Sequence, residues 1–246
     1  LVEGYLFSLN LWYIKVITPF CKSRSFKFTA KDLLIDVKSS INKDIMNFLS
    51  IDCSTDVGSL FVKTKTKTFD KILQSNKSNN DLLMKQILDF FKANNLKFDD
   101  ISHILINQGP GNFSGLRSSL STAKGISMAK NLKLLGYDNF IWLCAKFYKE
   151  KKFIYSLIKF REKYFIKGFD SNLNSIGKAK EITKDEIIEK YDKKFKVISK
   201  SATKHFEDRI LKLNNLNVVN LDHNMLENLK LRGLLDEDLI KPLYLS

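Results

Sequence analysis

A nine-residue stretch, residues 109–117, constrains the fold of this 246-residue chain more than any other part of it. It follows an apolar run at residues 104–106 and precedes a long helical pattern, so it indicates a strand, a tight turn and a helix start. Glycine has no Cβ atom, so Gly109 and Gly111 can adopt positive φ on either side of Pro110, whose own φ is fixed. We expect Ser114 to cap the helix.

The glycine loop supports two interpretations. Unpaired N–H groups at a helix start, with Gly115 allowing close approach, suit a phosphate or a carboxylate. A tight turn that binds nothing is the alternative, because glycine punctuation is common. The candidate loop residues are Gly109, Pro110, Gly111, Asn112, Phe113, Ser114, Gly115 and Arg117.

Three motifs together resemble the TsaB family of bacteria. They are Gly-Pro-Gly-Asn-Phe-Ser-Gly-Leu-Arg at residues 109–117, Ile-Asp-Cys-Ser-Thr at residues 51–55 and Pro-Leu-Tyr-Leu at residues 242–245. Members typically carry an Ile-Asp-Thr-Ser/Ala-Thr strand end, a Gly-Pro-Gly-Ser-Phe-Thr-Gly-Leu/Val-Arg loop and a closing Pro-x-Tyr-Leu-Arg. Their order and spacing match, and the similarity is firm from Met46 to about Tyr137.

This resemblance implies an α/β, actin-like (ribonuclease H-like) fold with two lobes and mixed sheets. It also implies an accessory, non-catalytic role in making threonylcarbamoyladenosine next to the tRNA anticodon. The expected partners are a catalytic paralogue of the TsaD type (the glycoprotease family), which forms a heterodimer with this chain, an ATPase of the TsaE type, and tRNA bound through the complex. ATP and metal would be used by the partners, the chain would have neither cofactor nor activity of its own, and in isolation it can form a homodimer.

Three segments are expected along the chain. Residues 1–45 form an extension of doubtful status, because the family-like pattern begins at Met46. Its apolar run, residues 5–14, is broken at Asn10 and too short to span a bilayer. Residues 46–148 form an actin-like lobe with the glycine loop, and residues 149–246 form a second, smaller α/β lobe after a charged boundary.

Hydrophobic spacing predicts the remaining elements. We expect strands at residues 48–51, 59–62, 63–69, 133–136, 153–158, 164–169, 195–198, 218–219 and 243–245. A helix capped near Asn79, Asn80 and Asp81 should end near residue 94. Further helices are expected at residues 114–130, 139–148, 184–191 (with Thr183 and Glu186 as a capping box) and 224–235.

The turn after the first strand contains Asp52, Ser54 and Thr55. In actin-like phosphotransferases the acid of this turn holds a metal-bound phosphate, a role open here to Asp52 with Ser54 or Thr55 donating hydrogen bonds. Alternatively, Asp52 only accepts hydrogen bonds from the backbone of its own turn. No metal-binding cluster in the sequence decides between them, since its three histidines and three cysteines are scattered.

The helix after the glycine loop is rich in small residues. Gly125 costs about 1 kcal/mol relative to Ala inside a helix, so a compensating contact is expected. Either this face packs on the chain's own sheet or it docks a partner helix. The candidate docking residues, on this helix and the preceding one, are Leu83, Ile87, Ser119, Ala123 and Gly125.

The formal charge of +14 raises the question of nucleic-acid binding. Only five of the 41 basic residues are Arg, and the lysines are spread along the chain. A solvated lysine surface and a dedicated RNA stripe are both open, although stacking and bidentate contacts would favour Arg. Three widely spaced cysteines indicate no disulfide framework and fit a reducing cytoplasm.

An independent actin-like phosphotransferase acting on a small molecule is the alternative function. Such an enzyme needs glycine-rich contacts to the nucleotide from both lobes. After Gly125 the glycines are isolated, namely Gly136, Gly168, Gly177 and Gly233. We therefore expect half of a nucleotide site to be missing, and the accessory-subunit hypothesis is favoured.

Overall fold

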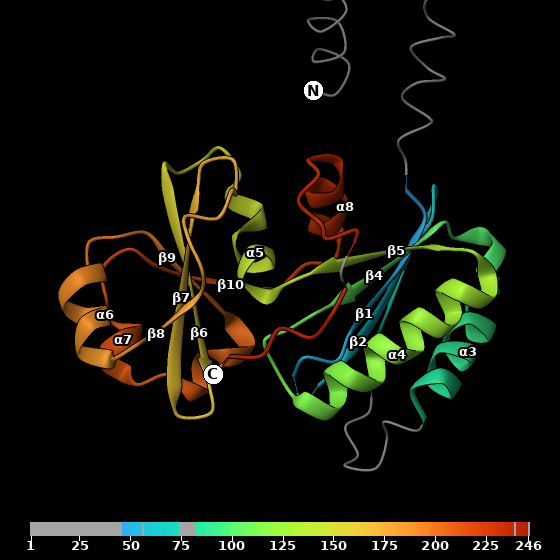
Figure 1. Cartoon of the computed structure of the whole chain (residues 1–246), viewed down its shortest axis with the longest axis horizontal. Coiled ribbons are helices and arrows are strands. Elements are labelled where there is room, and N and C mark those ends of the chain that lie inside the picture. The colour runs from blue at the N-terminus through green and yellow to red at the C-terminus, as the bar shows by residue number, and fades with distance from the viewer. Residues whose placement is uncertain (1–45, 56, 74–81, 239, 246) are drawn as a thin grey trace, which may run out of the picture. The chain divides into compact units, whose positions relative to one another are not determined.

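The computed structural model describes residues 46–55, 57–73, 82–238 and 240–245, which contain two five-stranded sheets (Figure 1). The predicted extension at residues 1–45 and the predicted cap at Asn79, Asn80 and Asp81 lie outside these residues. Both sheets mix parallel and antiparallel pairs, as the sequence predicted.

The first sheet places the two candidate motifs side by side. Its strands are β1 (Phe48–Asp52), β2 (Ser59–Lys63), β3 (Thr68–Ile72), β4 (His103–Asn107) and β5 (Lys133–Tyr137), in the order β3-β2-β1-β4-β5. β1 runs antiparallel to β2 and parallel to β4, with Ile51 opposite Ile106. Because parallel strands end at the same edge, the turn after β1 adjoins the glycine loop after β4.

Helices α3 (Leu83–Ala93) and α4 (Phe113–Lys130) lie next to each other beside this sheet (Figure 1). The predicted spacing of α3 is confirmed, since Leu83, Ile87, Phe90 and Phe91 are all buried. They form one core cluster with the apolar side chains of β1, β2 and β4.

The second sheet has the order β10-β9-β6-β7-β8. Its strands are β6 (Phe153–Phe160), β7 (Lys163–Asp170), β8 (Lys180–Ile182), β9 (Lys196–Ser199) and β10 (Leu216–Val219). Helices α6 (Lys184–Tyr191) and α7 (Asp208–Leu211) share a core cluster with it, and the capping box predicted for α6 at Thr183 and Glu186 is present. Short 3₁₀ helices occur at η2 (Phe98–Asp100) and η4 (Lys200–His205).

A third core cluster joins apolar residues of both sheets. Helices α5 (Asn139–Cys144), η3 (Ala145–Phe147) and α8 (Asn224–Leu231) contribute to it. Leu105 and Leu135 of the first sheet and Ile154 and Val197 of the second belong to the same cluster. Burial of one shared apolar core is therefore a principal stabilising term for residues 46–245.

Four predicted elements need correction. β3 begins at Thr68, not at residue 63, because residues 64–67 form a turn closed by a 2.9 Å bond from Thr64 N to Lys67 O. The helix predicted at residues 139–148 is split into α5 and η3, and α8 ends at Leu231, two residues before Gly233 at φ +67°. Residues 243–245 form no strand, although Leu243 N donates to Gln108 O at 2.6 Å.

Candidate functional site

The glycine loop is pressed against the backbone of the turn after β1. A Cβ atom on Gly111 would lie 2.0 Å from Ser54 O, and one on Gly115 would lie 2.3 Å from Cys53 O. Gly109 uses the conformational freedom of glycine, with φ +100°, whereas Gly111 does not adopt positive φ. Gly111 is needed for close approach instead, because no side chain fits between the two backbones.

Helix α4 is capped by Asn112, and the prediction of Ser114 was wrong. The Asn112 side chain accepts hydrogen bonds from Ser114 N at 3.1 Å and Gly115 N at 3.4 Å. Asn112 N itself donates to Ser54 O at 2.7 Å. Three N–H groups that an anion would need are therefore already paired within the chain. This pairing favours the interpretation of the loop as a tight turn that binds nothing.

A buried network of polar side chains connects the glycine loop to the turn after β1. Asn107 Nδ2 lies 2.9 Å from Asp52 Oδ1 and 2.7 Å from Asn139 Oδ1, while Asn107 Oδ1 accepts from Gly109 N at 2.8 Å. Asn139 Nδ2 donates to Ser54 Oγ at 3.1 Å and to Pro110 O at 2.8 Å. Each amide thus joins the turn after β1 to the glycine loop.

Sequence reasoning missed Asn107 and Asn139. Both are polar residues at or just after the end of a strand, Asn107 before the loop and Asn139 two residues after β5. That position was the only available signal, because the partners in the turn after β1 lie 55 residues from Asn107 and 85 residues from Asn139 in the chain.

Asp52 is 5% exposed and belongs to this network. Its Oδ1 accepts a hydrogen bond from Ser54 N at 2.9 Å. This is the contact expected if Asp52 only accepts hydrogen bonds from the backbone of its own turn. Burial raises the pKa of Asp52, while the hydrogen bonds from Ser54 and Asn107 act in the opposite direction. Thr55 Oγ1 donates to Val57 O at 2.8 Å and so serves its own turn.

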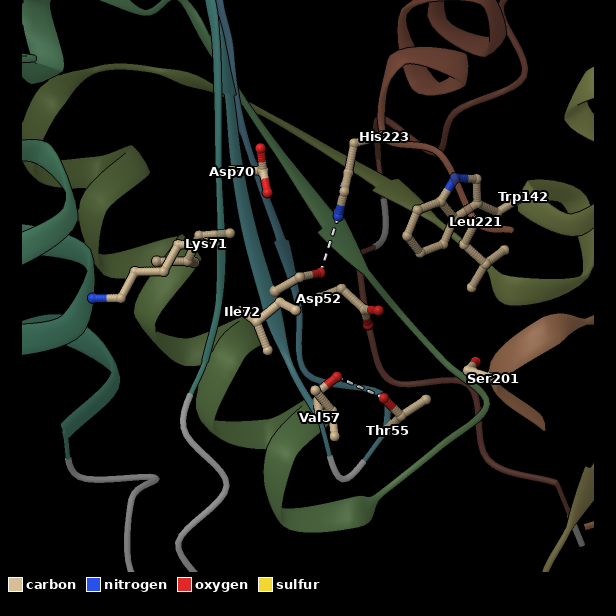
Figure 2. A pocket seen from close by; sticks show the side chains of 12 residues that line it. Asp52, Thr55, Val57, Asp70, Lys71, Ile72, Trp142, Ser201, Leu221 and His223 are labelled. Atoms are coloured by element: carbon tan, nitrogen blue, oxygen red, sulfur yellow. Dashed lines mark hydrogen bonds between the residues drawn. The ribbon is translucent and has the colours of Figure 1, made fainter. Parts of the chain in front are cut away.

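A cavity of about 270 Å³ opens beside Asp52 (Figure 2). His223 and Trp142 line it from the side opposite β2 and β3, and Ser59 belongs to its wall. His223 Nδ1 lies 2.9 Å from Ser50 Oγ and its Nε2 lies 3.0 Å from Ser59 Oγ. Burial lowers the pKa of His223 to about 4, so the imidazole is neutral near pH 7.

Many polar groups of the loop and of the turn after β1 are paired within the chain. The loop amides are paired internally, and Asp52 already accepts two hydrogen bonds through Oδ1. Within the described residues, no group of three or more His, Cys, Asp or Glu side chains is placed to hold a metal ion. These hydrogen bonds connect the glycine loop to the first sheet.

The docking residues predicted from sequence are mostly core residues. Leu83, Ile87 and Ala123 belong to the core cluster of the first sheet, and Ser119 is fully buried with its Oγ donating to Leu116 O at 3.1 Å. Their burial leaves no surface for a partner, which corrects those four assignments. Gly125 is exposed, and a Cβ atom added there would have no neighbour within 4 Å.

The exposed part of the loop is aromatic and cationic. Phe113 is 49% exposed, and the Arg117 guanidinium lies 4.5 Å from its ring centroid. Tyr244, from the closing motif, lies 5.3 Å from Phe113, centroid to centroid. The loop and the closing motif are thus brought together in space, as two parts of one surface.

The two mixed sheets, the glycine loop after β4 and the acid turn after β1 define an α/β protein of the actin-like class. The family model of TsaD, tRNA N6-adenosine threonylcarbamoyltransferase, matches residues 74–220. The chain belongs to this family.

One curated protein and two solved structures are also similar to this chain. A tRNA threonylcarbamoyladenosine biosynthesis protein TsaB from Buchnera aphidicola is 30% identical over 88 residues, which are 36% of this chain and 40% of that protein. Two Pseudomonas aeruginosa structures share the fold: YeaZ (TM-score 0.61, 16% identity) and a protein with similarity to peptidase YeaZ (TM-score 0.62, 15% identity). Each match covers 82% of this chain and 100% of the solved chain.

None of the helices in the described part of the chain has both the length and the apolar character needed to cross a bilayer.

Proposed function

We propose that this chain is an accessory, non-catalytic subunit in the transfer of a threonylcarbamoyl group to the tRNA adenosine next to the anticodon. It acts in the cytoplasm by forming a heterodimer with a TsaD-like enzyme, with a TsaE-like ATPase and tRNA as further members of the complex. The observation that carries the non-catalytic role is the closure of the glycine loop on its own chain. The N–H groups at the start of α4 are paired with the Asn112 side chain and with Ser54 O, so these donors are not free to bind a phosphate.

The exposed face of α3 and α4 is the proposed docking surface. Met84 and Leu88 on α3 are 38% and 48% exposed, and Met128 on α4 is 84% exposed. Gly125 lies one helical turn before Met128 and is open to solvent. Exposed apolar side chains beside a glycine allow a partner helix to approach closely.

Co-purification with a TsaD-like protein tests this surface. Gly125→Leu or Met128→Asp should abolish the complex while the isolated chain keeps its melting temperature. The matched variant Ala123→Leu overfills the core and should lose about 1–3 kcal/mol of stability without a direct effect on docking. A Gly125→Leu, Met128→Asp double variant that still co-purifies would remove this surface from the proposal.

The accessory role has its own test. Cells depleted of the native subunit should regain threonylcarbamoyladenosine in their tRNA, measured by nucleoside mass spectrometry, when this chain is supplied with its own TsaD-like partner. Recovery by this chain when the TsaD-like protein is absent would contradict an accessory role.

An independent phosphotransferase is kept as the second candidate because of the cavity beside Asp52. Calorimetry of the purified chain with ATP and magnesium decides between the two. The accessory role predicts no tight binding, whereas a low micromolar dissociation constant, about 8 kcal/mol, would favour the phosphotransferase.

A further inference from the structure

Lys196, the first residue of β9, is the one lysine with no exposed surface among the described residues. A lysine is rarely buried completely unless its charge is compensated. In this chain the ammonium has no direct ion-pair partner among the described residues. Lys196 therefore holds its charge by a different arrangement from the ion-paired lysines.

Four backbone carbonyl oxygens surround its ammonium. Lys196 Nζ lies 2.5 Å from Tyr191 O, 2.8 Å from Asp192 O, 2.9 Å from Lys194 O and 2.8 Å from Asn214 O. The first three belong to the end of α6 and the turn after it, and Asn214 lies just before β10. The ammonium thus links three separate segments of the second sheet and its helix.

The surrounding groups favour a positive charge at this point. The last carbonyls of α6 carry the negative end of the helix dipole. The Asp192 carboxylate is turned to Asn214, accepting from its N at 3.1 Å and from its Nδ2 at 3.0 Å, and so holds the Asn214 loop in place. Burial lowers the pKa of Lys196, and the nearby Asp192 charge partly opposes that shift.

The number of oxygens fits a spherical ion better than an ammonium. A lysine ammonium has three N–H donors, so four carbonyls at hydrogen-bond distance cannot each receive their own proton. A monovalent metal ion has no such directional limit, and rings of backbone carbonyls replace the hydration shell of K⁺ in selectivity filters. By contrast, the partly buried Lys63 and Lys167 each donate to a carboxylate oxygen.

We propose that the carbonyl oxygens of Tyr191, Asp192, Lys194 and Asn214 form a monovalent-cation site in which the Lys196 ammonium is the resident cation. The native chain then needs no potassium to order the end of α6 and the start of β9 and β10. A chain without this ammonium gains a site for K⁺ or a similar ion. The site lies apart from the glycine loop and is independent of the proposed function.

Thermal denaturation of the full chain tests the proposal. Lys196→Met removes the charge but keeps most of the side-chain volume, and Lys193→Met is the matched control, since Lys193 is exposed in the same turn. In choline chloride, Lys196→Met should lower Tm by roughly 10 °C, because four buried carbonyls lose the ammonium that they share. Potassium or rubidium chloride at the same ionic strength should restore much of that loss and leave the native chain and Lys193→Met unchanged.

Two further results decide the outcome. Should Lys196→Met not fold in choline chloride, its refolding yield in potassium chloride against choline chloride becomes the readout. A rubidium-soaked crystal of Lys196→Met should show an anomalous peak among the four oxygens. An equal loss of Tm in every salt, or an equal failure to refold, would show that Lys196 acts only as a hydrogen-bond donor and would overturn the proposal.

Discussion

His223 Nε2 lies 3.0 Å from Ser59 Oγ, although the two residues are 164 positions apart in the chain. The same imidazole bonds Ser50 Oγ through Nδ1 and stacks on Phe61, with ring centroids 5.3 Å apart. The segment before α8 is thereby tied to β1 and β2. Because the ring is buried, this contact depends on the imidazole staying neutral.

We expect stability to fall as the pH drops from about 6.5 towards 4. The pKa of His223 is lowered from 6.5 to about 4 in the folded chain, so the unfolded state binds the extra proton in this window. The contribution of neutral His223 to the free energy of unfolding is fully present above pH 6.5. It is lost as the pH falls to the folded-state pKa, by about 3 kcal/mol in total. Urea denaturation between pH 4 and 8 measures this change in the free energy of unfolding.

The variant His223→Gln isolates this effect from the titration of carboxylates. It should lose the part of the pH dependence that lies between the two pKa values, whereas His205→Gln, at an exposed position, should keep it. Identical pH profiles for the native chain and His223→Gln would contradict the assignment.

The glycines of the chain should respond to alanine in opposite directions. Gly111→Ala places a Cβ 2.0 Å from Ser54 O and should destabilise the fold by about 2 kcal/mol or more, since both backbones must move. Gly125→Ala has no atom to meet and should stabilise α4 by about 1 kcal/mol. Thermal melts of the two variants measure the difference, and a stabilising Gly111→Ala would contradict the close packing of the loop.

Asn107→Asp should destabilise the chain at neutral pH by roughly 2–4 kcal/mol. The new carboxylate would lie where the Asn107 amide now contacts Asp52 Oδ1 at 2.9 Å, and like charges cannot both stay ionised there. Acid should reduce the penalty, because one proton can then bridge the pair. Comparing unfolding at pH 7 and pH 5 with that of Asn107→Leu tests this, since the Leu variant should show no such recovery.

Cys144 and Cys53 should be unreactive in the folded chain. Burial raises the pKa of Cys144 well above its usual value and that of Cys53 to about 12, so neither forms much thiolate near pH 8. A Cys21→Ser variant removes the cysteine outside the described residues, and thiol labelling of it should proceed only as the chain unfolds in urea. Fast labelling without denaturant would show that one site opens locally.

Local sequence determined the elements whose causes are local. The apolar run of β1, the spacing of Leu83, Ile87, Phe90 and Phe91 along α3, and the Thr183–Glu186 capping box each involve residues close together in the chain. Such patterns act before tertiary contacts form, so they can be read directly. The motifs around residues 51–55 and 109–117 likewise indicated the family and the actin-like fold.

Tertiary structure alone decided how those pieces function together. The need for Gly111 comes from Ser54 O across the loop, and the neutral state of His223 comes from its burial beside Phe61. The charge of Lys196 is compensated by carbonyls at the end of α6 and just before β10. Small residues on α4 did not reveal that Ala123 is buried and Gly125 exposed. Burial, dielectric environment and hydrogen-bond partners are set by residues far apart in the chain, and no local pattern records them.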